Sequence, residues 1–387
     1  MSASTVRDRN ASAWLLTPDG SRTRPDLLDG MRRYADTDEV DIAIIGCGAG
    51  GSVLLQRLAR AGWSAVAFDA GPFWDPERDW VSDEAGSHHL YWTEPRQIGG
   101  GDPVPLGSNN SGRGVGGSMI HYAGYTPRFH PSDFRTLTTD GVGADWPIAY
   151  GDLARYYADI ENELPVAGED WPWGDPHSYP HHAHPVSGNG ETFLRGAEAA
   201  GVTAKVGPVA IANGRFGHRP HCIYRGFCLQ GCKVNAKASP LITHLPDALE
   251  HGAEVRADSM VASIGFDERT GRATGVHYFR DGVPRFQRAR MVAVAGYSIE
   301  TPGCCSTRHR RASRTGCATT STRPGATSWC RARRRRPAAS RTRSGCGRRP
   351  RPRSAPSSST RPTRRNPTSA GTPSRRCRRC RSRGRST

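Results

Sequence analysis

The chain has 387 residues, which is enough for two or three domains and a sizeable core. Its formal net charge is +18, but 26 of its 54 basic residues are arginines beyond Pro302, where the chain has no acidic residue. Residues 1–302 therefore hold 28 basic and 36 acidic residues and carry a net charge of −8, so a nucleic-acid interpretation applies to the C-terminal tail alone.

Residues 1–38 are predicted to form a polar leader. The leader has no apolar segment of the kind found in signal peptides, and no uninterrupted apolar run in the chain approaches the roughly 20 residues that span a bilayer. Four of the 11 cysteines precede Pro302, which is too few for a disulfide framework in a body of this size. We expect a cytoplasmic protein without a membrane span.

The strongest motif opens at Gly46. A buried-strand pattern, Val40 to Ile45, runs into a Gly-x-Gly-x-x-Gly turn, followed by a predicted helix from Ser52 to Ala61 and a second short strand that ends in Asp69. The predicted apolar face of the helix consists of three residues: Leu54, Leu58 and Ala61. A strand, a turn and a helix in this order predict a dinucleotide site, and a glycine-rich turn without a ligand is the alternative.

Each part of this motif has a physical task. Gly46 permits the tight turn, Gly48 lets the backbone approach a pyrophosphate, and Gly51 allows close packing of helix and strand. Asp69 can accept hydrogen bonds from the adenosine ribose, and its charge disfavours a 2′-phosphate. We interpret Cys47, inside the turn, as a small filler and not as a reactive thiol.

A second glycine-rich loop, residues 109–124, favours FAD over a nicotinamide dinucleotide. The isoalloxazine ring extends further than a nicotinamide, so FAD needs a second close approach of backbone, which Gly116 and Gly117 can supply. The motif and this loop place the first part of an FAD-binding domain at residues 39–128.

Residues 129–214 are predicted to form a cap or substrate-domain segment. A helix begins near Asp152, a loop rich in Pro, His and Gly covers residues 165–190, and a second helix covers residues 191–201. The loop contains four histidines: His177, His181, His182 and His184. Their irregular spacing favours a solvated loop over a metal site.

Residues 215–302 are predicted to complete the FAD-binding domain, with alternating apolar positions over residues 253–295 that indicate a meander of strands. A loop before these strands carries Cys222, Cys228 and Cys232. Three thiolates in one loop can ligate a metal or a cluster, whereas a structural zinc usually has four protein ligands. A structural Cys- and Gly-containing loop is the alternative.

The tail, residues 303–387, contains no Leu, Ile, Val, Phe, Met or Tyr. Such a segment cannot bury enough apolar surface to offset a chain entropy of about 1–2 kcal/mol per ordered residue, so we expect disorder. A reading-frame shift near Pro302 in a G/C-rich gene explains both the composition and its abrupt start. Codons compatible with residues 303–307 read Arg-Leu-Leu-Leu-Asn in another frame. A native Arg-rich tail is the alternative.

Four segments together resemble the glucose-methanol-choline (GMC) oxidoreductases, especially the branch of gluconate and other sugar dehydrogenases. These segments are residues 41–71, 112–124, 145–157 and 295–302. The resemblance implies an α/β fold: a Rossmann-like FAD-binding domain interleaved with an α+β substrate domain, here incomplete and followed by the disordered Arg-rich tail. It also implies oxidation of an alcohol or sugar by hydride transfer to the flavin.

The resemblance assigns roles to individual positions. It implies that FAD is bound by these residues: Gly46, Gly48, Gly51, Asp69, Gly116 and Gly117. Val261 matches the position whose backbone meets the adenine, and Asp69 replaces the family's usual Glu with a shorter carboxylate. His121 matches a position that is covalently attached to the flavin in pyranose oxidase-like members; the alternative is packing beside the ring.

The resemblance also bears on electron transfer and on what the chain lacks. Cys222, Cys228 and Cys232 resemble the [3Fe–4S] motif of bacterial flavin sugar dehydrogenases, which would imply an electron-acceptor protein as partner. The family's catalytic base is a histidine in the C-terminal part of the protein, and no position in residues 303–387 matches it. We therefore expect an impaired enzyme, with an FAD-binding remnant without turnover as the alternative.

Overall fold

In a computed structural model, the chain is described for residues 24–76, 79–83, 85–98, 104–107, 111–170, 177–217 and 219–306. All of these residues belong to one compact unit, Met1–Arg334, and a second unit, Arg335–Thr387, lies wholly outside them. The first part of the predicted leader, residues 1–23, and the predicted tail from residue 307 onwards also lie outside the described residues.

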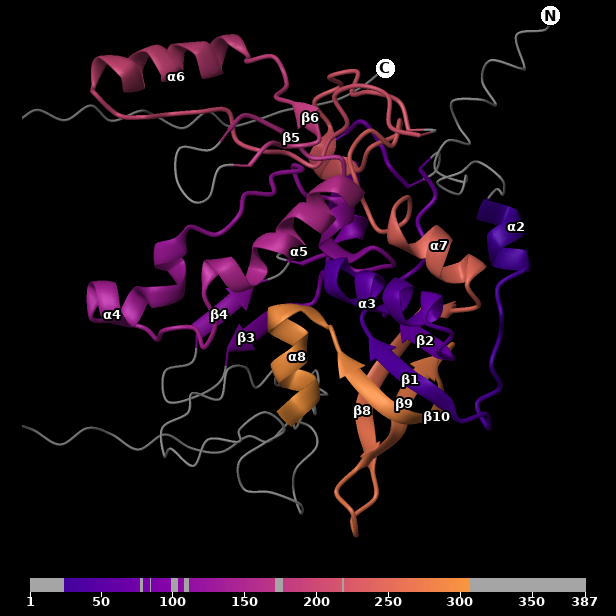
Figure 1. Cartoon of the computed structure of the whole chain (residues 1–387). Coiled ribbons are helices and arrows are strands. Elements are labelled where there is room, and N and C mark those ends of the chain that lie inside the picture. Colours follow the sequence, from indigo (N-terminus) through magenta and orange to yellow (C-terminus); the bar gives the residue numbers. More distant parts are fainter. Residues whose placement is uncertain are drawn as a thin grey trace, which may run out of the picture. The chain divides into compact units, whose positions relative to one another are not determined.

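A six-stranded sheet in the order β7-β2-β1-β10-β9-β8 forms the centre of the fold (Figure 1). The bounds of its strands are β1 Val40–Ile45, β2 Ala65–Phe68, β7 Glu254–Arg256, β8 Ser259–Phe266, β9 Ala273–Arg280 and β10 Val283–Val294. β1 pairs in parallel with β2 and β10, and β2 with β7, whereas β8, β9 and β10 pair antiparallel. This mixed sheet confirms the predicted α/β class and the predicted meander.

Helix α3, Ala49–Arg60, follows β1 and packs with α7, His244–Glu250, over the parallel strands (Figure 1). The predicted apolar face of α3 was wrong by one residue. Leu55 and Ala59 are the buried residues. Of the predicted residues, Leu54 and Leu58 are only partly buried, and Ala61 is exposed. The reason is Gly51, which lies against the Gly46 carbonyl and turns its own helix row toward the sheet.

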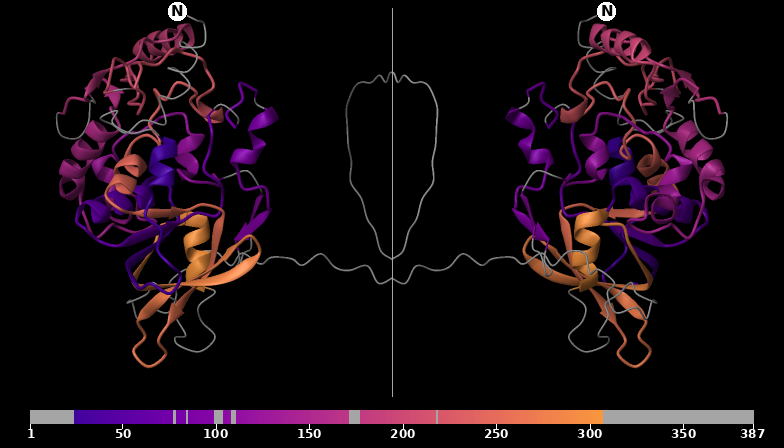
Figure 2. Two further views of the ribbon diagram at one scale, coloured as in Figure 1. Left: turned by 90° about the vertical axis from the view of Figure 1, so that its right-hand side faces the viewer. Right: turned by 90° about the vertical axis from the view of Figure 1, so that its left-hand side faces the viewer.

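The predicted cap segment contains short elements and two longer helices. Their bounds are η4 Pro131–Arg135, α4 Thr136–Asp140, α5 Tyr150–Glu163, β5 Ala167–Gly168, β6 His181–His182 and α6 Gly188–Ala199. Arg128 binds the Glu161 carboxylate with two hydrogen bonds, of 2.7 and 2.6 Å, and so fixes α5. Helix α6 buries none of its residues and lies at the periphery in every view (Figure 2).

The remaining elements lie along the loops and at the end of the described chain. Their bounds are α2 Arg24–Asp29, η2 Ala85–Leu90, β3 Arg96–Ile98, β4 Val104–Gly107, η3 Gly117–Ile120, η5 Cys228–Gln230 and α8 Tyr297–Ser306. Helix α8 follows β10 and runs four residues past Pro302, where we had placed the start of the tail. No helix among the described residues is both long and apolar enough to cross a membrane.

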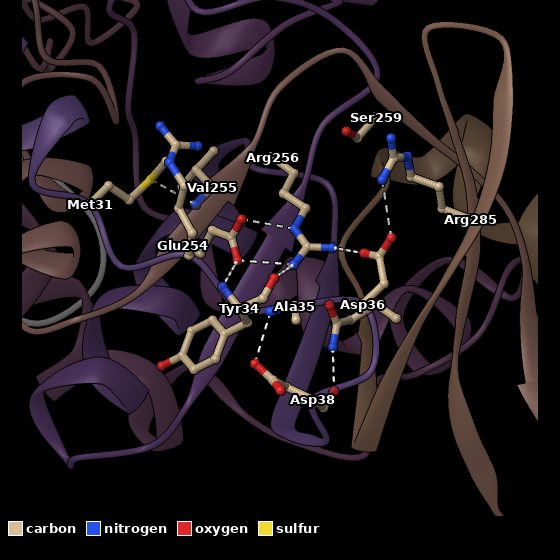
Figure 3. A network of polar contacts seen from close by, with 12 residues as sticks. Met31, Tyr34, Ala35, Asp36, Asp38, Glu254, Val255, Arg256, Ser259 and Arg285 are labelled. Atoms are coloured by element: carbon tan, nitrogen blue, oxygen red, sulfur yellow. Dashed lines mark hydrogen bonds and ion pairs between the residues drawn. The ribbon is translucent and has the colours of Figure 1, made fainter.

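A buried polar network holds residues 34–38 to the edge of the sheet (Figure 3). Arg256 at the end of β7 donates to Glu254 at 2.9 Å, to Asp36 at 2.8 Å and to the Tyr34 carbonyl at 2.6 Å. The Tyr278 hydroxyl on β9 also donates to Asp36, at 2.6 Å. Part of the predicted leader is therefore a component of the fold.

Candidate cofactor site

The two glycine-rich loops meet beyond the carboxyl end of β1. The Gly116 amide donates to the Cys47 carbonyl at 2.9 Å, and a Cβ added to Gly117 would lie 2.8 Å from the Gly48 Cα. Gly46 has φ +97°, and a Cβ on Gly51 would lie 1.9 Å from the Gly46 carbonyl oxygen. Glycine is therefore required at Gly46 and Gly51 by the fold itself, before any ligand is considered.

The N-terminus of α3 is open toward this junction. Its N-cap, Gly48, has no side chain to bond the first-turn N–H groups, and Ala49 and Gly50 are exposed. Free first-turn N–H groups and the positive end of the helix dipole suit a phosphate. A Cβ on Gly48 would meet Gly117 only at 3.6 Å, so the protein alone does not demand glycine at this position. The donors present here fit the pyrophosphate of a dinucleotide.

Asp69 follows β2 and is 8% exposed. Its carboxylate accepts hydrogen bonds from the amides of Cys47 and Gly71, both at 3.1 Å. Burial raises the pKa of Asp69 to about 6, and these amides and that of Gly114 oppose the rise. The amides orient the carboxylate at the end of β2, where the sequence predicts a ribose contact.

Val261 lies in β8, the strand that starts beside Asp69. The Ser259 amide donates to the Asp69 carbonyl at 2.7 Å, and Val261 packs against a core cluster that contains Phe68. The strand that carries the predicted adenine position therefore begins beside the backbone of Asp69, although three strands separate β8 from β2 in the sheet order.

His121 follows the 3₁₀ helix that starts at Gly117. Its ring lies 4.1 Å from that of Tyr91, and its Nε2 atom is buried without a hydrogen-bond partner among the described residues. Burial, together with the charge of Lys237, lowers the pKa of His121 to about 4. The Nε2 atom packs against the second glycine-rich loop, where a Cβ on Gly112 would lie 2.7 Å from it, so the ring is held within the loop that the sequence predicts near the flavin.

The three cysteines of the predicted metal site do not form one in this structure. Among the described residues, no group of three or more His, Cys, Asp and Glu side chains is arranged to hold a metal ion. Cys222 Sγ accepts from the Tyr224 amide at 3.3 Å, and Cys232 Sγ accepts from the Lys237 amide at 3.4 Å. Burial raises the pKa of the Cys228 thiol, and Cys232 and Cys222 lie close enough to add to the rise. The [3Fe–4S] cluster stays a prediction, and we derive no electron-transfer step through one. The four loop histidines are likewise separate, with His184 Nε2 bonded to the Ile211 carbonyl.

Sequence reasoning missed Lys237, which is 2% exposed and binds backbone on both sides of His121. A lysine is ordinarily an exposed residue, so its type gave no reason to place it in the interior. The only local signal was its position in the cysteine loop, between Ala236 and Ala238.

Together, the sheet order, the glycine junction and the carboxylate after β2 define a dinucleotide-binding α/β protein with an added antiparallel meander. The profile of the family "GMC oxidoreductase" matches residues 108–306. The chain belongs to the GMC oxidoreductase family, whose members are flavoproteins with an FAD-binding fold.

Individual relatives agree with this assignment. The chain is 31% identical over 293 residues to 2-methyl-1,2-propanediol dehydrogenase of Mycolicibacterium austroafricanum, covering 68% of this chain and 50% of that protein. It is 26% identical over 302 residues to the fructose dehydrogenase large subunit of Gluconobacter japonicus, covering 69% and 54%. Among solved structures, pyridoxine 4-oxidase from Mesorbium loti aligns with a TM-score of 0.47 and 15% identity, covering 69% and 51%. The chain spans about half the length of the curated relatives it matches.

Proposed function

We propose that this chain is the cofactor-binding part of an FAD-dependent dehydrogenase acting on the CH–OH groups of alcohols or sugars. The observation that carries the proposal is the junction of Gly48 and Gly117 over the uncapped N-terminus of α3. The names of the relatives support the substrate class, since one is a diol dehydrogenase and another a sugar dehydrogenase. A non-oxygen electron acceptor is part of the same proposal.

The chain's own residues have defined tasks in this proposal. The α3 N-terminus holds the pyrophosphate, Asp69 accepts from the ribose hydroxyls, the backbone of Val261 meets the adenine, and Gly116 and Gly117 admit the flavin. When bound, FAD supplies a flavin ring that accepts a hydride from the alcohol carbon. His121 packs beside this ring as a neutral imidazole, which its low pKa supports.

The second part of the proposal is that this chain binds FAD without efficient turnover. In the family, a C-terminal histidine takes the hydroxyl proton, and no position in residues 303–387 matches that motif. The family profile and α8 both end at Ser306, just beyond the point where we infer a frame shift. The base and much of the substrate-domain core would belong to the sequence that the other frame encodes.

A single methyl group tests the cofactor site. Gly48→Ala has room within the protein but places a Cβ where the pyrophosphate would approach, so folding should be retained. We expect FAD affinity to fall by about 2 kcal/mol, roughly 30-fold, in a titration of flavin fluorescence. Gly196→Ala is the control, because Gly196 lies exposed in α6 with open space around it and should leave affinity unchanged. Equal affinity for Gly48→Ala and the unaltered chain would contradict the proposal.

A further inference from the structure

Lys237 is a buried lysine whose ammonium is hydrogen-bonded to backbone carbonyls. Its ammonium donates to the carbonyls of Ile120 at 2.8 Å, Tyr122 at 2.7 Å and Cys228 at 2.6 Å. These three acceptors use all three donors of the group. Burying a charge is costly unless it is well bonded, so an ammonium with three carbonyl acceptors keeps these carbonyls in place.

Two of the three carbonyls flank His121 in the chain, one before it and one after it. Lys237 Nζ also lies 4.8 Å from the centre of the Tyr122 ring, and the Tyr122 hydroxyl donates to the Ala238 carbonyl at 3.0 Å. The backbone on either side of His121 is thus tied to the cysteine loop through one side chain and its neighbour. The third carbonyl, of Cys228, belongs to the cysteine loop itself.

The surrounding backbone adds a second connection between the same segments. The Ala210 amide donates to the Gly124 carbonyl at 2.7 Å, and Lys237 forms a β-bridge with Ile211. A Cβ on Gly124 would lie 2.7 Å from the Ile211 side chain, so the segments are in close contact. Lys237 therefore lies where three segments meet: the second glycine-rich loop, residues 209–212 and the loop that carries the three cysteines.

We propose that Lys237 is a positioning residue, which holds the segment Ile120–Tyr122 and so keeps the His121 ring in its place against the glycine-rich loop of the proposed flavin site. This inference rests on the proposed FAD site, but its geometry exists without the cofactor. The cysteine loop then has a task that requires no metal, namely to supply the anchoring carbonyl of Cys228 and the lysine itself.

The test uses the full chain and two measurements. Lys237→Met removes the ammonium at similar length, and Lys205→Met is the matched control at an exposed lysine. We expect about tenfold weaker FAD binding for Lys237→Met, because the carbonyls on either side of His121 lose the donor that fixes them. In the cofactor-free chain, ¹³C NMR should show the pKa of His121 rising toward the ordinary histidine value. Lys205→Met should change neither.

The two measurements separate the positioning role from a merely structural one. If Lys237→Met lowers the melting temperature but leaves both FAD affinity and the His121 titration unchanged, Lys237 is structural and the proposal fails. If the unaltered chain does not bind FAD, the proposed function fails, while the His121 titration still tests the contact with Lys237.

If Lys237→Met does not fold, Lys237→Arg provides the test. A planar guanidinium keeps the charge but cannot donate to the same three carbonyls in the geometry of an ammonium. We expect Lys237→Arg to weaken FAD binding and to shift the His121 resonances of the cofactor-free chain. Unchanged values for both would overturn the proposal.

Discussion

The protonation state of Asp69 that favours folding is the opposite of the one that favours cofactor binding. Burial raises its pKa to about 6, above the ordinary value of 3.8, so the cofactor-free chain holds the protonated form more strongly than the unfolded chain does. Its contribution to stability is full below the ordinary value and is lost as pH rises through 6, by at most about 3 kcal/mol. Binding of ribose hydroxyls requires the ionised form, so FAD affinity should instead fall as pH drops through 6.

Fluorescence titrations of FAD between pH 5 and 8 measure this dependence. We expect a loss of about tenfold per pH unit below 6, since the free energy of protonation changes by about 1.4 kcal/mol per unit. Asp69→Asn should bind weakly and without this pH dependence. A Kd that is constant from pH 5 to 8 in the unaltered chain would show that Asp69 does not contact the cofactor in its ionised form.

The residues of the site differed in how far the sequence foretold them. Gly46, Gly51 and Asp69 were predictable because their spacing is a local consequence of one strand–turn–helix unit. The contact between Gly48 and Gly117 joins positions 69 residues apart. The sequence predicts that both approach the cofactor, but no local pattern reports that they touch. Lys237 was missed because its role depends on three carbonyl positions that no local pattern specifies.

At the scale of elements, the network around Arg256 connects β7, β9 and residues 34–38. The Arg256 and Glu254 side chains are each 4% exposed, whereas Asp36 is 31% exposed. Replacing Arg256 with Met leaves Glu254 as a buried, unpaired charge, which typically costs 3–5 kcal/mol. We expect urea denaturation to show a loss of about that size.

Arg285 supplies the control for this network. It also binds Asp36, at 3.3 Å, but is 45% exposed, so Arg285→Met should cost less than about 1 kcal/mol. Equal losses for the two variants would mean that burial does not set the strength of these ion pairs. The double replacement of Arg256 and Glu254 by apolar residues should recover part of the stability.

The sequence predicts the type of each helix and strand more accurately than its first residue and the face that it buries. The helix after Gly46 begins at Ala49, three residues before the predicted start, and its buried row follows from the contact of Gly51 with Gly46. A hydrophobicity pattern places Leu54 and Leu55 equally well on an apolar face. The close approach of two backbones, which the pattern does not report, decides between them.

At the scale of the whole chain, our proposal assigns dinucleotide binding to the described residues, whereas no position in residues 303–387 matches the family's catalytic histidine. We expect that the chain as written, saturated with FAD, shows no bleaching of flavin absorbance when alcohols or sugars are added anaerobically. The physical reason is that oxidation of an alcohol also requires removal of the hydroxyl proton. The Nε2 atom of His121 is buried against Gly112, where it cannot pass that proton to solvent.

The coding DNA around codon 302 supplies the matching experiment. If an uninterrupted alternative frame encodes a Leu-rich helix and a later histidine motif, the protein expressed in that frame should bleach the flavin with a substrate alcohol or sugar. Its FAD affinity should also exceed that of the present chain, because the restored segment completes the substrate-domain core. Bleaching by the present chain would show instead that a base lies within its 387 residues. That result would assign proton removal to a residue beside the junction of Gly48 and Gly117. His121 would then be the first residue to substitute in a search for that base.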